Sequence, residues 1–230
     1  MKNHIINLFT CLVVASRSAW ACLGVASTRS RILSVLIAML NLIPAGRLTA
    51  QTFKTLHSFT PTSPYGNSNS DGAAPYAGLI TNSSGTILYG TAYQGGSSGN
   101  GTVFAVNTDG TGFTNLHSFT YSSDGAGPYA GLIRSGKTLY GTAQQGGTWY
   151  DGTLFAVNTD GAGFTNLHSF AGGDGAIPNG GLILSGNTLY GTAAGGGSSG
   201  KGSVFAVHTD GTGFTNLHSF TTFSINASGV

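Results

Sequence analysis

The sequence predicts an all-β protein, a β-propeller-like array of about three four-stranded blades plus one extra strand, in which the ring stays open. Three observations predict it. A unit of about fifty residues recurs three times, each unit holds four short apolar segments separated by Gly, Asn, Asp and Ser, and no helical periodicity follows residue 50. Four short strands in one such unit match the size of a propeller blade. A β-solenoid is the main alternative, although its coils are usually shorter.

Residues 1–50 predict a leader that exports the chain. This segment has five basic residues and no acidic one, and an apolar run at 32–45 follows the basic stretch 27–31. The run is too short to span a bilayer unaided, as in a secretory signal, and Ala50 is the expected cleavage position. An earlier apolar run at 5–16 leaves two interpretations, a start codon downstream of Met1 or a membrane anchor. We expect an extracellular or cell-surface protein.

The charge of the remaining chain excludes nucleic acid as an expected partner. The formal charge of +2 is an average, because residues 51–230 hold four Lys and Arg against seven Asp and no Glu. The basic balance therefore belongs to the leader. Cys11 and Cys22 also lie in the leader, so the exported part is expected to have no disulfide and no cysteine ligand for a metal.

The repeat divides the chain after the leader into a repeat region at 51–220 and a tail at 221–230. Its three units span about 76–120, 128–170 and 179–220, and residues 51–59 resemble the last strand of a preceding unit. Propellers typically need four to eight blades to close. We therefore expect a fragment of a longer protein or a protomer that self-associates to complete the ring. Membrane contact is expected only through the leader or a C-terminal anchor missing from this chain.

The second unit shows the four expected strands in order. They are YAGLI at 129–133, KTLYGTA at 137–143, GTLFAVN at 152–158 and GFTNLHSF at 163–170. The last two are joined by an Asp-Gly turn, and we expect this pair to supply the positive φ angles of a tight hairpin. The turn residues of the three units are Asp109, Gly110, Asp160, Gly161, Asp210 and Gly211.

The His, Ser and Asp residues of the repeat favour architecture over catalysis. Every Asp is followed by Gly, which is turn chemistry, and without Glu the chain lacks the paired carboxylates of a glycosidase. In each copy of LHSF the His and Ser are neighbours on one strand and point to opposite faces. We predict hydrogen-bonded structural histidines, no catalytic residue, no metal site and no cofactor. These histidines are His57, His117, His168 and His218.

The loops between the second and third strands predict a binding rim. They share one edge of the array with the segments leading into each first strand, and this edge varies in length and composition while the opposite edge has tight turns. Aromatic side chains on a polar rim are typical of carbohydrate or protein recognition. The candidate ligand-binding residues, for a glycan or a protein, are Tyr76, Tyr93, Tyr129, Trp149 and Tyr150.

The ordered motifs DG, AGLI, LYGT, GG, GTVF and LHSF resemble the choice-of-anchor GloVer tandem-repeat proteins of bacteria. The resemblance covers residues 51–220 and implies export, a propeller-like array and no known catalytic activity. We therefore expect a non-catalytic binding or surface-interaction module. A structural surface-layer scaffold is one alternative, and a propeller enzyme acting on carbohydrate or alcohol is another. An enzyme should place an acid and base pair where one unit departs from the others.

Overall fold

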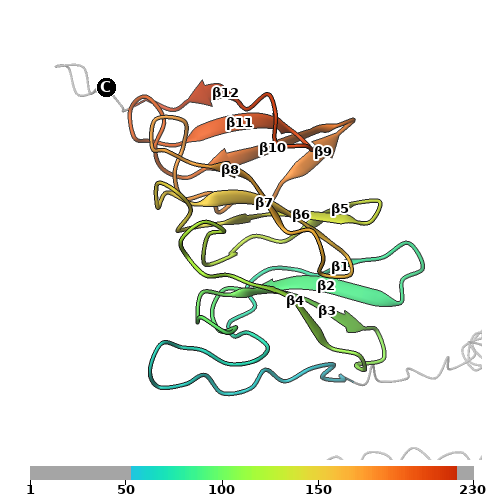
Figure 1. Ribbon diagram of the computed structural model, residues 1–230. Helices are drawn as coiled ribbons and strands as arrows, with labels where there is room; N and C mark the ends of the chain where they lie inside the picture. Colours follow the sequence, from blue (N-terminus) through green and yellow to red (C-terminus); the bar gives the residue numbers. More distant parts are fainter. Residues whose placement is uncertain (1–52, 222–230) are drawn as a thin grey trace, which may run out of the picture. The chain divides into compact units, whose positions relative to one another are not determined.

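A computed structural model describes residues 53–221 and confirms the predicted fold. The described chain forms three four-stranded antiparallel sheets, one for each repeat, and has no helix (Figure 1). All three sheets belong to one compact unit, Lys54–Val230. The predicted leader, both cysteines and nearly all of the tail lie outside the described residues.

The twelve strands follow the chain in sets of four. In each sheet the order in space equals the order in sequence, so every strand pairs only with its neighbours along the chain. The strands are β1 (Ile80–Thr81), β2 (Ile87–Ala92), β3 (Thr102–Asn107), β4 (Thr114–Ser118), β5 (Ile133–Ser135), β6 (Thr138–Ala143), β7 (Thr153–Asn158), β8 (Thr165–Ser169), β9 (Ile183–Ser185), β10 (Thr188–Ala193), β11 (Ser203–His208) and β12 (Thr215–Ser219).

The first strand of each repeat is shorter than the sequence predicts. In the second repeat the expected strand 129–133 is reduced to β5, which starts at Ile133. The residues before it follow Pro128, which has no N–H to donate, and include Gly131, which weakens a ladder. Ala126 pairs with Gln145 instead, beyond the end of β6. This bridge places the segment before the first strand beside the loop after the second, as predicted for the rim.

The hairpin between the third and fourth strands owes its shape to glycine and a side-chain acceptor. Gly161 N–H donates to Asn158 O at 2.9 Å, and Asp160 Oδ1 accepts from Ala162 N–H at 2.9 Å. The positive φ angles fall on Gly161 and Gly163, so only the glycine of the predicted Asp-Gly pair has one and Asp160 does not. Glycine adopts this region without a steric cost, whereas Asp160 contributes its carboxylate as an Asx turn.

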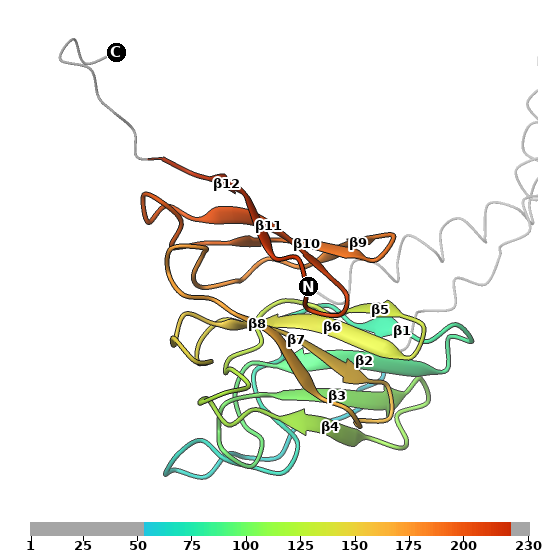
Figure 2. The same cartoon turned by 45° about the horizontal axis from the view of Figure 1, so that its top comes forward.

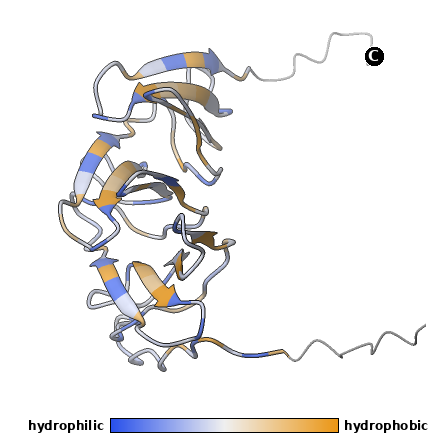
Figure 3. Ribbon diagram, turned by 90° about the vertical axis from the view of Figure 1, so that its right-hand side faces the viewer, coloured by the Kyte–Doolittle hydropathy of each residue, from blue (hydrophilic) through white to orange (hydrophobic). Residues whose placement is uncertain are grey.

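The cores lie between the sheets rather than inside any one of them. One buried cluster joins the first and second sheets and includes Phe119 and Phe155, and another joins the second and third and includes Phe170 and Phe205. Figures 1 and 2 show the three sheets following one another, and Figure 3 shows hydrophobic residues concentrated in their strands. A single sheet cannot bury both faces alone, so each repeat depends on its neighbours.

We call the face of a sheet that is directed toward the preceding repeat its front face and the face directed toward the following repeat its rear face. In the second sheet Leu132 and Leu139 belong to the front cluster, whereas Tyr140 and Leu154 belong to the rear cluster. Leu79 and Leu189 hold front positions in the first and third sheets, by their place in the repeat. The array is open because no described repeat precedes the first sheet or follows the third.

Residues 53–60 differ in one respect from the predicted extra strand. They form no strand, because none of the strands between residues 53 and 221 pairs with their backbone. Their side chains nevertheless make the contacts of an outer strand. The His57 ring stacks on Phe113 with centroids 3.7 Å apart, and Phe59 meets Phe104 edge to face. The segment thus covers part of the front face of the first sheet.

Candidate functional site

A His–Asp–Phe contact joins each repeat to the next. His117 Nε2 lies 3.1 Å from Asp124 Oδ2, and the His117 ring stacks on Phe164 of the following repeat at 3.6 Å. The carboxylate can only accept, so the hydrogen belongs to the ring nitrogen. His57 and His168 make the same contacts with their own Asp and Phe partners. The prediction of hydrogen-bonded histidines is confirmed for these three residues.

Three of the seven Asp residues have a larger role than the turn chemistry that the sequence suggested. Asp71, Asp124 and Asp174 accept from histidine, while Asp109, Asp160 and Asp210 cap the hairpin turns. The difference could have been found in the sequence. In the first and second repeats the His in LHSF is followed seven or six residues later by Asp-Gly, so the pairing recurs with the unit.

The neighbouring serine takes no part in this contact. Ser118 Oγ accepts from Asn115 Nδ2 at 2.8 Å, away from the bond between His117 and Asp124. The pleat separates adjacent side chains, and the His and Ser of this copy bond to different partners. The arrangement supplies no base beside a nucleophile, which hydrolysis by a triad requires.

Hydrogen bonds hold the carboxylate of Asp124 in its ionised form. Burial raises the pKa of this group, but bonds from His117 and from the Thr120 hydroxyl and N–H outweigh it, so the pKa lies below its ordinary value of 3.8. The same causes lower the pKa of Asp71, with His57 and Thr60 as donors. The contacts between repeats thus contain ionised carboxylates that already accept hydrogen bonds from neighbouring His and Thr residues.

Residues 53–221 show neither a metal-binding cluster nor a membrane-spanning helix. This part of the chain contains no group of three or more His, Cys, Asp or Glu side chains placed to hold a metal ion. It also contains no helix with the length and hydropathy needed to cross a membrane.

Arg134, one of the residues by which the second repeat departs from the third, donates to Gly136 O and to Ser83 Oγ of the preceding repeat.

Three of the predicted rim aromatics converge between the first and second repeats. Tyr76 lies 5.7 Å from Tyr93 and 5.2 Å from Tyr129 between ring centroids, and Tyr93 lies 6.1 Å from Tyr129. Tyr76 and Tyr129 are 62% and 44% exposed. Within residues 53–221 none of the three hydroxyls has a hydrogen-bond partner. We call these residues the tyrosine cluster.

The backbone that carries the tyrosine cluster is tied across the two repeats. Gly127 N–H donates to Asn100 O in the loop of the first repeat at 2.8 Å, and its own carbonyl accepts from Gln144 N–H. Gly127 has a φ of +62°, and a Cβ there would meet the Tyr93 ring at 2.7 Å. The glycine therefore lets Tyr93 lie against the segment that presents Tyr129.

The other two predicted rim residues form a second group with Tyr121. The rings of Tyr121 and Tyr150 lie 6.0 Å apart, and Trp149 is 62% exposed. Tyr121 and Tyr150 have φ angles of +81° and +66°, which side chains other than glycine rarely adopt. Tyr121 was not among the predicted rim residues, because its backbone conformation is visible only in the structure.

The other repeats place glycine where this second group has tyrosine. Gly172 occupies the position of Tyr121 in the third repeat, and Gly99 and Gly200 occupy that of Tyr150, all with positive φ. Each tyrosine in this region costs on the order of 1–3 kcal/mol relative to an unstrained residue. At these positions the second repeat thus exposes aromatic rings at a conformational cost that glycine avoids, just as Ala74 and Ile177 have a positive φ where the second repeat has Gly127. We call Tyr121, Trp149 and Tyr150 the strained aromatic group.

Several solved structures are similar to this chain, and each is similar over only part of its length. A nidogen/laminin complex matches with a TM-score of 0.46 and 16% identity, over 63% of this chain and 48% of that one. TolB from Acinetobacter baumannii gives 0.45 and 14%, over 74% and 36%. A putative TolB from Agrobacterium tumefaciens gives 0.43 and 12%, over 66% and 50%. The chain spans half or less of these proteins.

The family comparison covers most of the chain. No curated protein sequence matches it. The model of the Gloeobacter/Verrucomicrobia repeat matches residues 46–229, the region that forms the three sheets and their flanking segments. The sequence motifs predicted this relationship, and the chain belongs to the Gloeobacter/Verrucomicrobia repeat family.

Proposed function

We propose that this chain is a non-catalytic, exported module that binds glycan through the aromatic rim of its repeat array. The observation that carries the proposal is the tyrosine cluster, in which Tyr76, Tyr93 and Tyr129 converge while Tyr76 and Tyr129 remain about half exposed. Export rests on the predicted leader. The His–Asp contacts give no support to catalysis, because they repeat at every joint and are occupied by structural partners.

The chemistry of the tyrosine cluster suits a sugar. The apolar faces of sugar rings pack on aromatic rings, and a tyrosine hydroxyl at the end of each ring can bond to sugar hydroxyls. The cluster combines such rings with hydroxyls that have no partner in the described part of the chain. In the third repeat Asn179 occupies the position of Tyr129, so the three repeats between residues 53 and 221 contain this combination once.

The strained aromatic group supports the same function on independent grounds. Conformational strain persists where the surrounding structure imposes it, and it concentrates at functional sites. Tyr121 lies where the third repeat has Gly172, and Tyr150, which lies where both other repeats have glycine, is 66% exposed. Burial of these rings therefore does not explain why tyrosine occupies the two positions. Ring contact with a ligand does.

A glycan array, followed by calorimetric titration of any positive glycan, tests the proposal. The full chain is compared with two variants that copy the other repeats, Tyr129→Asn, after Asn179, and Tyr150→Gly, after Gly99 and Gly200. Trp149→Ala is a third. Tyr150→Gly should raise the free energy of unfolding by roughly 1 kcal/mol, because the strain is removed. A loss of binding in this variant then cannot come from unfolding.

The control is Tyr65→Ala, because Tyr65 is 89% exposed and belongs to neither aromatic group. It should bind glycan as the unmodified chain does. If the chain binds no glycan, or binds equally well in all three rim variants, the proposal fails. A chain without any ligand would favour a structural surface-layer scaffold instead.

A further inference from the structure

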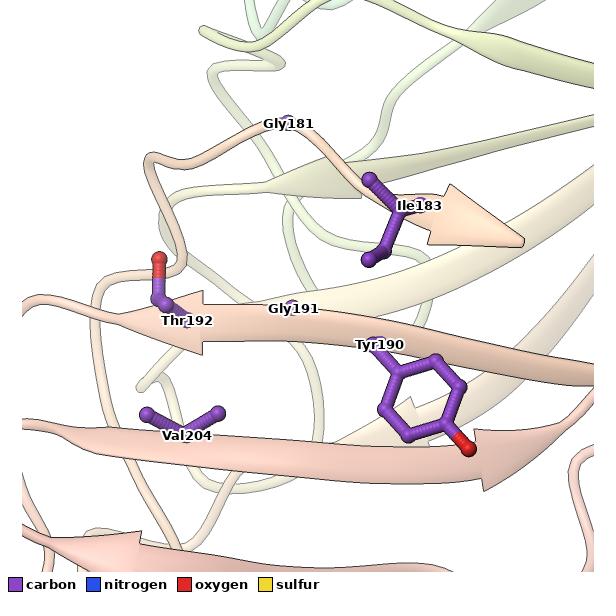
Figure 4. Close-up of a pocket in the computed structure, with 6 residues that line it drawn as sticks. All are labelled: Gly181, Ile183, Tyr190, Gly191, Thr192 and Val204. Atoms are coloured by element: carbon purple, nitrogen blue, oxygen red, sulfur yellow. The ribbon is translucent and has the colours of Figure 1, made fainter. Parts of the chain in front are cut away.

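The rear face of the third sheet is the surface that the other two sheets bury. In the second sheet Tyr140 and Leu154 are almost fully buried, whereas Tyr190 and Val204 hold the same positions in the third sheet and are partly exposed. Ile183 is 66% exposed. A shallow hollow of about 210 Å³ on this face is lined by Gly181, Ile183, Tyr190, Gly191, Thr192 and Val204 (Figure 4).

The outer strand of the third sheet is open on the same side. Phe220 is 46% exposed, whereas Phe119 and Phe170 at the same position in the first two repeats are fully buried. Leu217 is 52% exposed. His218 meets its neighbour Phe220 edge to face, but within residues 53–221 it has neither the stacked Phe nor the Asp that the other three histidines have.

The front face of the first sheet is covered only in part. Leu79 is 48% exposed, whereas Leu132 and Leu182 at the same position are almost fully buried. Residues 54–60 fill the place of a preceding outer strand, with His57 on Phe113 and on Asp71. Within the described chain this segment makes no backbone-to-backbone hydrogen bond, unlike β12, which pairs with β11.

We infer that the rear face of the third sheet binds the front face of the first sheet in a second copy of this chain. The contact continues an interface that occurs twice within the chain, between sheets of the same sequence. In this contact His218 of one copy donates a hydrogen bond to Asp71 and stacks on Phe113 of the other copy. Strand β12 then replaces residues 54–60 of the other copy, which leave because no backbone-to-backbone hydrogen bond holds them. The joined surfaces are unlike, so copies add in series or close a ring.

Sedimentation velocity on the full chain over a range of concentrations tests this contact. The average mass should rise with concentration. Ile183→Asp combined with Leu217→Asp should raise the dissociation constant at least about tenfold, because each places a charge in an apolar contact. Both side chains are more than half exposed, so the fold should tolerate them. His57→Ala should shift association to lower concentrations, because it releases the competing segment from Phe113 and Asp71.

Asn187→Asp is the matched control, an acidic substitution at an exposed turn of the same sheet, and it should leave association unchanged. Circular dichroism checks that every variant remains folded. The inference is overturned if both the parent chain and His57→Ala stay monomeric at all concentrations. It is also overturned if association persists unchanged with Asp at 183 and 217, because another surface must then be responsible.

Discussion

Asp124 shows how a single residue can join two repeats. Its carboxylate accepts from Thr120 and His117, and the His117 ring lies on Phe164 of the next repeat. A buried acceptor that loses such donors costs about 1–3 kcal/mol, more when it is charged. Protonation of the carboxylate weakens the hydrogen bonds that it accepts. The stability that this contact between repeats contributes therefore depends on pH.

We predict that the folded chain loses stability on acidification and that Asp124→Asn weakens this loss. The pKa of Asp124 is lowered in the folded state, so the unfolded chain binds a proton at a higher pH than the folded one. The stabilisation is complete above the ordinary pKa of 3.8 and is lost as the pH falls through the lower folded value. Urea unfolding between about pH 5 and pH 2 measures the slope. Equal slopes for the two proteins would contradict the prediction.

The hairpin before each outer strand acts as an element that docks on the preceding repeat. A Cβ on Gly161 would lie 3.0 Å from the Leu116 carbonyl oxygen of the first repeat, and Gly110 and Gly211 stand equally close to Leu56 and Leu167. The turn glycines identified in the sequence thus have two requirements, a positive φ and an approach to backbone that leaves no room for a side chain.

Gly161→Ala should therefore destabilise the array more than an alanine at a glycine that needs only the positive φ. Gly136 in the same repeat is that control, with a φ of +58° and no atom within 4 Å of its Cβ position. We expect about 1–3 kcal/mol from strain in both variants and roughly 1 kcal/mol or more in addition at Gly161 from overpacking. Chemical denaturation measures both. Equal losses would show that the contact with Leu116 contributes nothing.

The strands of each repeat could be predicted from the periodicity of the sequence, whereas the conformations and contacts of single residues could not. The recurring apolar segments predicted the four strands of each sheet, because burial of alternate side chains imposes that pattern. The partners of Asp124 and the positive φ of Tyr121 could not be predicted in the same way. The first depends on how adjacent repeats pack, and the second contradicts the backbone preference of tyrosine.

At the scale of the whole molecule, stability lies in the interfaces between repeats. The second sheet contributes to both buried clusters, whereas the first and third sheets each contribute to one. Repeat arrays of this kind derive their stability from nearest-neighbour contacts, and terminal repeats have fewer of them. The partial cover that residues 54–60 give the first sheet has no counterpart among the described residues on the third.

Amide hydrogen exchange should therefore rank the three outer strands. Protection should be lowest in β12, where Leu217 and the following Phe220 are about half exposed, and higher in β4 and β8, which are followed by the fully buried Phe119 and Phe170. Local opening of β12 exposes little further apolar surface, so its free energy is small, whereas opening of β8 breaks the core between the second and third sheets. Mass spectrometry of peptides covering the three strands measures this at a concentration where the chain is monomeric. Protection of β12 equal to that of β8 would mean that the rear face of the third sheet is already covered in solution.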